Sequence, residues 1–182
     1  MASNDTATAE QYLTRSIARD PVSFESHAML ARLYAERGDL ERARATLEQF
    51  AASHADAAAP RTAIGIVLEA AGRPAEARSR YEEAVTLDPN EPIASNNLAR
   101  LYAADEGRLD RALELARKAV DRLPNDPDVH DTLGWVAFRA GRLKLAAAEL
   151  EAAVALNGQE PTYRDHLQQV RRAIEAEARE SR

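Results

Sequence analysis

The sequence predicts an all-α fold built from repeated helix–turn–helix units. Apolar residues fill 45% of the 182 positions but aromatic residues only 5%, which suits a helical core of small aliphatic side chains better than an aromatic-rich β-sandwich. Alanine occupies 39 positions and is the best helix former, because it loses no side-chain entropy on folding. The third observation is an internal repeat, and it defines the individual helices.

The repeat is marked by glycines at intervals of 34, 35 and 34 residues, namely Gly38, Gly72, Gly107 and Gly141. Each glycine is followed five residues later by an alanine and preceded by a pair consisting of one aliphatic and one small residue. Glycine permits the positive φ that a tight turn between helices requires. Prolines in Asp20-Pro21, Asp88-Pro89 and the segment 123–127 keep the same phase, and proline marks helix boundaries. We therefore expect one turn and two helices per repeat.

This pattern resembles the tetratricopeptide repeat, a 34-residue helix–turn–helix unit with the pattern W-x₂-L-G-x₂-Y…A-x₃-F…P. The resemblance covers nearly the whole chain and implies a single domain, residues 1–182, folded as a right-handed α-solenoid. We expect an N-terminal helix or half repeat at 6–23 and a one-sided capping helix at 161–182. The four full repeats are assigned to residues 24–57, 58–91, 92–126 and 127–160, the third with one extra residue in its turn at 105–107.

The chain departs from this pattern at two kinds of position. The tryptophan position is filled by His27, Arg61, Ser95 and His130. The first full repeat has Ala55 where proline is expected, inside the alanine-rich segment 51–59. The sequence therefore leaves open whether the second helix of that repeat ends at this junction or continues through it.

Composition excludes several function classes. The net charge of −6 disfavours nucleic-acid binding, which needs a basic face. Without cysteine there are no disulfides, thiolate nucleophiles or thiolate metal sites. No apolar run approaches the roughly 20 residues that span a bilayer, and residues 1–10 lack the basic and apolar regions of a signal peptide. We expect the chain as given to be cytoplasmic and not inserted in a membrane, or periplasmic if it is a piece of a longer envelope protein.

The sequence offers no catalytic constellation. It has no phosphate loop, dinucleotide fingerprint, H-E-x-x-H or nucleophile elbow, and its four histidines are never within metal-ligand spacing of one another. We interpret His27 and His130 as packing residues at the tryptophan position. The expectation is a protein that is not an enzyme and that has no cofactor and no metal.

The resemblance implies that function lies in the groove lined by the first helix of each repeat, where this family holds peptides or partner helices. Amides there can pair with peptide N–H and C=O groups, arginines can hold a carboxylate, and a tryptophan can anchor a partner. The candidate partner-binding residues are Arg32, Glu36, Thr62, Ile66, Glu69, Asn96, Asn97, Arg100, Asp131, Trp135 and Arg139. The leading hypothesis is a non-catalytic scaffold or adaptor that binds a peptide or protein segment.

Structural alternatives remain open for several of these residues. Asn97 stands where the family often uses asparagine for helix packing, and Trp135 can pack on Tyr163 of the capping helix instead of on a partner. The arginines can pair with neighbours such as Glu69 or Asp131. The carboxylate clamp of chaperone cofactors is rejected, because its Lys/Asn/Asn/Lys/Arg set falls on Ala28, Arg32, Ala63, Ile93 and Asn97.

The rival hypothesis is a self-assembly module that forms a homo-oligomer within a larger bacterial complex. The segments 96–110 and 130–136 resemble, more weakly, bacterial tetratricopeptide proteins of exopolysaccharide or exosortase systems, which connects this rival with the cell envelope or polysaccharide export. The 22 arginines against 2 lysines fit a GC-rich bacterial source. The sequence predicts a protein or peptide partner but neither its identity nor its polarity.

Overall fold

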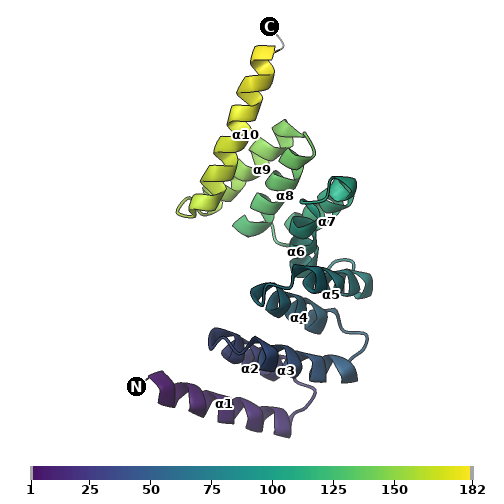
Figure 1. The fold of residues 1–182 in the computed structure, drawn as a ribbon, viewed down its shortest axis with the longest axis vertical. Helices are drawn as coiled ribbons and strands as arrows, with labels where there is room; N and C mark the ends of the chain where they lie inside the picture. Colours follow the sequence, from purple (N-terminus) through teal and green to yellow (C-terminus); the bar gives the residue numbers. More distant parts are fainter. Residues whose placement is uncertain (1, 181–182) are drawn as a thin grey trace. The chain divides into compact units, whose positions relative to one another are not determined.

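The computed structural model describes residues 2–180, and within them all regular structure is helical (Figure 1). This confirms the predicted all-α fold. The helices are α1 (Ala2–Arg19), α2 (Phe24–Glu36), α3 (Leu40–Ser53), α4 (Ala58–Ala70), α5 (Pro74–Leu87), α6 (Pro92–Tyr102), α7 (Leu109–Arg122), α8 (Pro127–Arg139), α9 (Leu143–Leu156) and α10 (Pro161–Glu180), with a short 3₁₀ helix, η1, at Glu106–Arg108.

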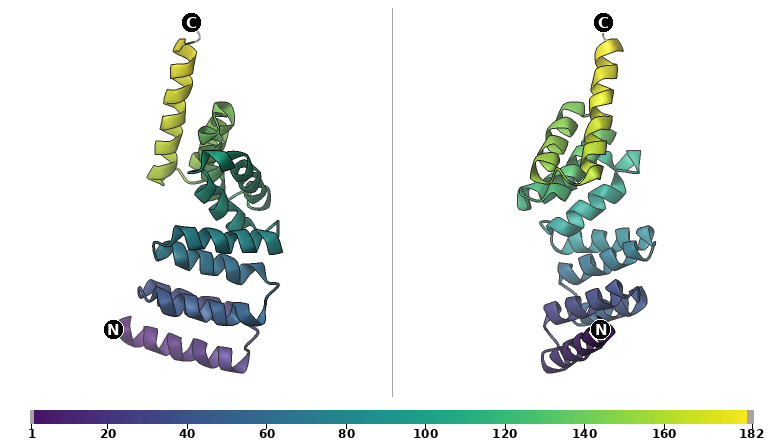
Figure 2. Two further views of the ribbon diagram at one scale, coloured as in Figure 1. Left: turned by 45° about the vertical axis from the view of Figure 1, so that its right-hand side comes forward. Right: turned by 90° about the vertical axis from the view of Figure 1, so that its left-hand side faces the viewer.

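The helices fall into two compact units, Met1–Pro89 and Asn90–Arg182. In each unit, consecutive helices pack against each other as hairpins, as the two further views in Figure 2 show. Each of the spans 24–57, 58–91, 92–126 and 127–160 holds two long helices. We call the first of them the A helix (α2, α4, α6, α8) and the second the B helix (α3, α5, α7, α9).

In the first unit the core consists of apolar side chains from α1 to α5, with Leu47, Ile64 and Tyr81 almost fully buried. Burying a large apolar side chain stabilises a fold by about 1.5–3 kcal/mol. Gly65 lies so close to Tyr81 that a Cβ at this position would collide with the ring. The absence of a side chain at Gly65 therefore allows the close approach of α4 and α5.

The N-terminal helix α1 is attached to α2 and α3 through one carboxylate. Glu10 accepts hydrogen bonds from the Tyr34 hydroxyl at 3.0 Å and from the Arg37 and Arg42 guanidinium groups at 2.7 Å each. The Arg42 guanidinium also lies 4.1 Å from the centroid of the Tyr34 ring. The hydrogen bond from Arg42, followed by that from Tyr34, lowers the pKa of Glu10 below its usual value.

The second unit is built in the same way from α6 to α10. Its core includes Leu98, Leu115, Val136 and Leu150, all nearly inaccessible to solvent. The last helix, α10, packs on α8 and α9 and buries only Tyr163, Leu167 and Val170 of its 20 residues. The remaining faces of α10 are largely polar and exposed, which fits the predicted one-sided capping helix.

Three of the four turn glycines have the expected left-handed backbone. Gly38, Gly72 and Gly141 have φ values of 77°, 71° and 70°. The prediction is wrong at Gly107, which belongs to η1 and does not have a positive φ. The extra residue lengthens this turn enough to form a 3₁₀ helix, and the Asp105 carboxylate accepts a hydrogen bond from the Gly107 N–H at 3.1 Å.

The junction left open by the sequence contains a helix end. Helix α3 ends at Ser53 and α4 begins at Ala58. In place of the missing proline, the Arg61 side chain crosses the junction, and its Nη1 donates to the carbonyl oxygens of His54 at 2.8 Å and Ala57 at 3.1 Å. A side chain from the tryptophan position therefore satisfies backbone groups that a helix end would otherwise leave unpaired.

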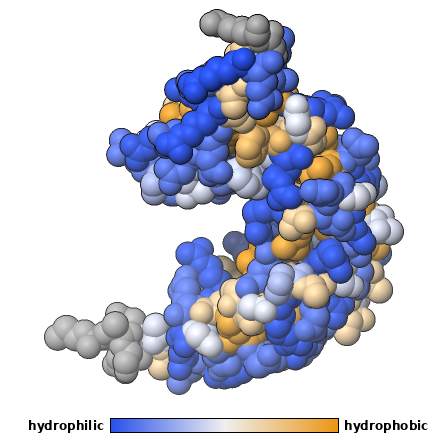
Figure 3. All heavy atoms as spheres, turned by 45° about the horizontal axis from the view of Figure 1, so that its top comes forward, coloured by the Kyte–Doolittle hydropathy of each residue, from blue (hydrophilic) through white to orange (hydrophobic). Residues whose placement is uncertain are grey.

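No helix among the described residues has the length and hydrophobicity to cross a membrane. On the face shown in Figure 3, the surface is mostly hydrophilic, and the hydrophobic areas on it are small and separate.

Candidate functional site

The predicted partner-binding residues all lie on A helices. Those of the first unit are on α2 and α4, which contact each other, and those of the second unit are on α6 and α8, which also contact each other. Within each unit the structure therefore brings the predicted residues onto neighbouring helices. The individual side chains differ in whether they reach solvent.

In the first unit, only some of the predicted side chains are exposed. Arg32 and Glu36 form an exposed ion pair at 2.8 Å, one helical turn apart on α2. Thr62 is buried and donates to the carbonyl of Ala58, and Glu69 accepts a hydrogen bond from the buried Tyr81 hydroxyl at 2.9 Å. Thr62 and Glu69 are thus held by bonds within the chain.

The same two helices of the first unit carry exposed apolar side chains. Ile66 of α4 is 47% exposed and Met29 of α2 is 52% exposed. Ile66 is one of the predicted partner-binding residues, and Met29 lies on a neighbouring A helix but is not in the predicted set. Large apolar side chains at such exposure on adjacent helices are the residues that gain most from being covered by a partner.

In the second unit, the capping helix covers two predicted residues of α8. The His166 Nδ1 lies 2.8 Å from the Asp131 carboxylate, and the His166 ring stacks on Trp135 with centroids 4.3 Å apart and planes at 22°. Phe138 also contacts Trp135, with ring centroids 5.4 Å apart. The ring of α10 that contacts Trp135 is therefore that of His166. The sequence analysis had named Tyr163 as the alternative contact.

Tyr163 makes a second bond between α10 and α8, because its hydroxyl donates to the Asp128 carboxylate. Burial, and then this hydrogen bond, raise the pKa of Tyr163 above its usual value. The pairs Tyr163–Asp128 and His166–Asp131 are each separated by 35 residues. The sequence analysis did not identify His166. The available signal was its separation of 35 residues, about one repeat, from the predicted residue Asp131.

Helix α6 contributes the two asparagines and Arg100. The Asn96 side-chain oxygen is buried and accepts no hydrogen bond within the part of the chain that the structure describes. Asn97 is half-buried, whereas Arg100 and Arg139, in the last turns of α6 and α8, are exposed. An unpaired buried oxygen costs about 1–3 kcal/mol, so Asn96 is a position at which a further donor would stabilise the unit.

The histidines at the tryptophan position are engaged in packing and hydrogen bonds. His27 is buried, its Nδ1 lies 2.9 Å from the Ser23 carbonyl oxygen, and its ring contacts that of Phe50 with centroids 4.9 Å apart. His130 lies 2.8 Å from the Glu149 carboxylate and 3.0 Å from the Pro124 carbonyl. Among residues 6–180, whose side chains are described, no group of three or more histidines and carboxylates is arranged to hold a metal ion.

Comparison with known proteins identifies the repeat. Residues 1–64 and 103–170 match one family model and residues 62–127 match a second, and both models carry the description tetratricopeptide repeat. The photosystem I assembly protein Ycf3 of Synechococcus sp. (strain CC9605) is 33% identical over 92 residues, which are 49% of this chain and 53% of that protein. The chain thus spans about half the length of this curated relative.

Solved structures with the same fold include MamA, from residue 41 to its end, of Desulfovibrio magneticus RS-1. It has a TM-score of 0.69 and 21% identity, with 83% of this chain and 85% of that one covered. The protein TTC0263 of Thermus thermophilus has a TM-score of 0.65 and 18% identity, with 93% and 92% covered. At these identities the likeness concerns the fold.

Proposed function

The chain belongs to the tetratricopeptide repeat family, and on that premise we propose that it is a non-catalytic scaffold that binds a peptide or protein segment on its A-helix faces. Binding by shape and side-chain chemistry needs no reacting group, in keeping with a sequence without a catalytic constellation. The family supplies the fold, whereas the argument for a site has to come from the side chains themselves.

The observation that carries the proposal is the exposure of Met29 and Ile66 on the adjacent helices α2 and α4. A partner side chain that covers both removes apolar surface from water at about 25 cal/mol per Å². Methionine adapts its shape to different partners because it is unbranched and flexible. The exposed pair Arg32–Glu36 lies on the same helix as Met29 and offers polar contacts at the rim.

The α6–α8 face of the second unit supports the same proposal with different chemistry. Trp135 offers a large ring that is partly covered by His166, and Arg139 is exposed in the last turn of α8. Asn96 and Asn97 carry amides that can pair with the N–H and C=O groups of an extended peptide. This face fits a segment with an aromatic or aliphatic residue next to a carboxylate, which Arg139 can hold in a bidentate pair.

The role of such a scaffold follows from what a held segment can do. The relative from Synechococcus is named as an assembly protein, and assembly requires that one component be held while another is added. We extend this role to the present chain as part of the proposal. The partner is then a protein segment that leaves the A-helix face when its complex is complete.

The proposal is tested with peptides selected from a random-peptide display library on the full chain. Their affinity is measured by fluorescence anisotropy for the parent protein and for the double variant Met29→Ser/Ile66→Ser. Loss of two apolar contacts is expected to weaken binding by about tenfold or more. Leu156→Ser is the matched control, because Leu156 is 45% exposed but lies at the end of the B helix α9.

The triple variant Asn97→Ala/Arg100→Ala/Trp135→Ala tests the second unit in the same assay. Helicity by circular dichroism should remain at the parent level in every variant. If the double and the triple variant both bind the selected peptides as tightly as the parent protein does, the A-helix faces are not the binding site and the proposal fails.

The second candidate function is self-assembly through the exposed face of α1. The observation in its favour is Tyr12 of α1, which is 73% exposed. A large ring at this exposure is a suitable contact for a second copy. Light scattering across a dilution series separates the two functions, since a mass that falls on dilution and that Tyr12→Ser reduces to a monomer indicates self-assembly.

A further inference from the structure

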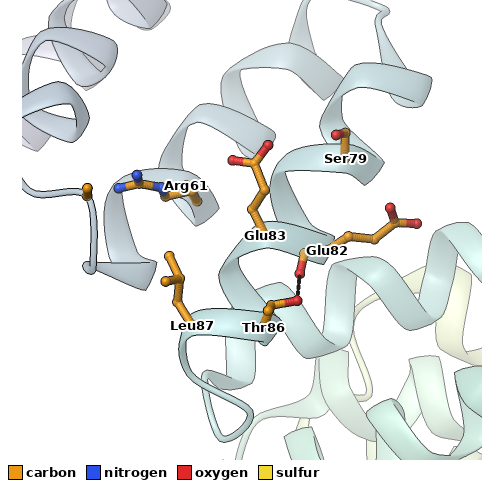
Figure 4. Close-up of a pocket in the computed structure, with 7 residues that line it drawn as sticks. Arg61, Ser79, Glu82, Glu83, Thr86 and Leu87 are labelled. Carbon is orange, nitrogen blue, oxygen red and sulfur yellow. Dashed lines mark hydrogen bonds between the residues drawn. The ribbon is translucent and has the colours of Figure 1, made fainter.

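The first unit contains a cleft away from the residues assigned to partner binding. It has a volume of about 430 Å³ and lies between the start of α4, the part of α5 from Ser79 to Leu87 and the loop before α4. This volume is within the range of roughly 300–1,000 Å³ that ligand pockets occupy. The lining residues are Ala55, Arg61, Ser79, Glu82, Glu83, Thr86 and Leu87, six of which are labelled in Figure 4.

In the preceding repeat, the residue that corresponds to Arg61 belongs to a cluster of aromatic rings. In the span 24–57, His27 packs on Phe50 with ring centroids 4.9 Å apart, and His54 stacks on Phe50 with centroids 4.0 Å apart and planes at 6°. Shifted by the repeat length of 34 residues, their counterparts are Arg61, Ala84 and Asp88. None of these has a ring, and the cleft opens beside Arg61.

The charged walls of the cleft differ in how their groups are satisfied. Arg61 is half-buried, and among residues 6–180 its only bonds are from Nη1 to the carbonyl oxygens of His54 and Ala57; no carboxylate in this range lies within ion-pair distance of it. Its Nε and Nη2 atoms have no hydrogen-bond partner within the same range. Glu83 forms an ion pair with Arg80 at 3.2 Å. In Figure 4 its side chain extends from α5 toward α4, the helix that carries Arg61.

Apart from Glu82, whose carboxylate points away from Arg61 in Figure 4, the remaining walls are apolar or neutral. Leu87 is exposed and points toward Arg61 in Figure 4, while the Thr86 hydroxyl donates to the Glu82 carbonyl at 2.7 Å. The Ser79 hydroxyl makes no hydrogen bond to any other described residue. The cleft thus combines a cation with open donors, a carboxylate that can accept, and the apolar side chain of Leu87.

From this combination we infer that the cleft is a binding site for a tyrosine side chain of a partner protein. A carboxylate would be repelled by Glu83, and an ammonium or guanidinium group would be repelled by Arg61. A neutral ring meets neither repulsion, packs on Leu87 and lies against the Arg61 guanidinium, which attracts the face of an aromatic ring. The phenol hydroxyl then donates to Glu83, a bond that phenylalanine cannot make.

The site is independent of the binding proposed for the A-helix faces. Five of its seven lining residues belong to the B helix α5, and none of them is Met29, Ile66 or another predicted partner-binding residue. A protein that binds segments on its A helices gains from it a second, separate contact, which increases selectivity for partners that carry a tyrosine at the right place.

The test is an NMR titration of the ¹⁵N-labelled full chain with N-acetyl-tyrosinamide. Shifts are expected at the amides of Ser79, Glu83, Thr86 and Leu87 and at the Arg61 Nε–H. N-acetyl-phenylalaninamide should bind about tenfold more weakly, the factor that one hydrogen bond to a charged acceptor provides. The amides of N-acetyl-glutamate and N-acetyl-lysine should cause no shifts at these positions.

Matched variants locate the site. Thr86→Trp should fill the cleft and abolish the tyrosine shifts, whereas Ala52→Trp places the same ring at the corresponding exposed position of the preceding repeat and should leave them unchanged. Glu83→Ala should remove the preference for tyrosine over phenylalanine. Glu82→Ala should keep that preference, because the Glu82 carboxylate points away from Arg61 in Figure 4.

Several results would overturn the assignment. One is a larger response to the glutamate or lysine probe than to tyrosine, which would make the cleft a site for a charged side chain. Another is a tyrosine response that Thr86→Trp leaves intact or that lies outside the cleft, and a third is no response to any probe. The peptide affinities of the Met29→Ser/Ile66→Ser variant test the A-helix faces in a separate experiment. A failure of the tyrosine-site proposal is therefore distinguishable from a failure of the proposed binding on the A-helix faces.

Discussion

The four turn glycines are equivalent in the sequence but not in the structure, which makes alanine substitution a sharp test. Gly72 has a φ of 71°, and a Cβ on it would meet no atom within 4 Å. Gly107 lacks a positive φ, and a Cβ there would meet only the Asp105 carboxylate oxygen at 3.4 Å, an ordinary contact. Neither substitution creates a collision, so the difference between Gly72→Ala and Gly107→Ala isolates the backbone conformation.

The expected magnitudes follow from two opposing effects. Placing an L side chain in the left-handed region costs about 1–2 kcal/mol. Replacing glycine by alanine also restricts the unfolded chain, which stabilises the fold by about 0.4–1 kcal/mol. Gly72→Ala should therefore destabilise the protein by about 0.5–1 kcal/mol, whereas Gly107→Ala should stabilise it by about 0.4–1 kcal/mol. The two variants should differ by about 1–2 kcal/mol.

Urea denaturation followed by circular dichroism measures this difference through the midpoint and the slope of the transition. Gly38→Ala and Gly141→Ala provide further left-handed controls, because their φ values of 77° and 70° resemble that of Gly72. The urea midpoints of the variants are compared only where the slope of the transition is unchanged, because a changed slope in a repeat protein indicates that the repeats have become uncoupled. The reasoning is refuted if Gly107→Ala is as destabilising as the other three.

Three further predictions concern side-chain contacts. Glu10→Gln should loosen α1, because the hydrogen bond from Arg42 lowers the pKa of Glu10. The charged Glu10 stabilises the fold above its ordinary pKa, and this stability is lost as the pH falls through the lowered value. The protection factors of the α1 amides, which correct exchange rates for pH, should therefore be as low in the parent protein at acid pH as in the variant at neutral pH. Tyr163 has a raised pKa and should ionise above the pH at which an exposed tyrosine ionises in a near-ultraviolet absorbance titration, so Tyr163→Phe should remove one tyrosine from the late part of that titration. The stability that Tyr163 contributes should be lost as the pH rises above the ordinary tyrosine pKa. His166→Ala should uncover Trp135, the only tryptophan, so that its emission shifts to the red and acrylamide quenches it more strongly; an unchanged spectrum would contradict the stacking.

The fold was predictable because the repeat fixes backbone geometry at a few positions. Turn glycines, small residues at the helix contacts and prolines at helix starts each limit the backbone in one way, and their phase specifies the hairpins. Gly107 shows the boundary of this reasoning. One inserted residue changes the conformation of the turn from a left-handed glycine to a 3₁₀ helix. The sequence still has a glycine at the expected position, so it does not reveal this change.

The candidate site was less predictable than the fold. The position of a residue in the repeat indicates the direction of its side chain, but not which other residues the side chain contacts. Thr62 and Glu69 hold the expected registers, yet they bond to Ala58 and Tyr81 within their own repeat. Trp135 meets His166, which comes from a helix outside the four repeats. Burial depends on neighbours that stand about one repeat length away in the sequence, so a pattern read along one helix cannot determine it.

The tryptophan position shows how such a repeat acquires different properties in each copy while the backbone stays the same. His27 packs into a ring cluster and closes its repeat, whereas His130 bonds to Glu149 and to the Pro124 carbonyl and ties α8 to α9 and the preceding loop. Arg61 reaches the carbonyl oxygens of the junction before α4 and lines a cleft. One register therefore supplies a core residue, a connection between helices and the side chain of a cleft for which we propose a binding role. Since these substitutions leave the hairpin intact, the positions that depart from the repeat pattern are those at which to look for function in this chain.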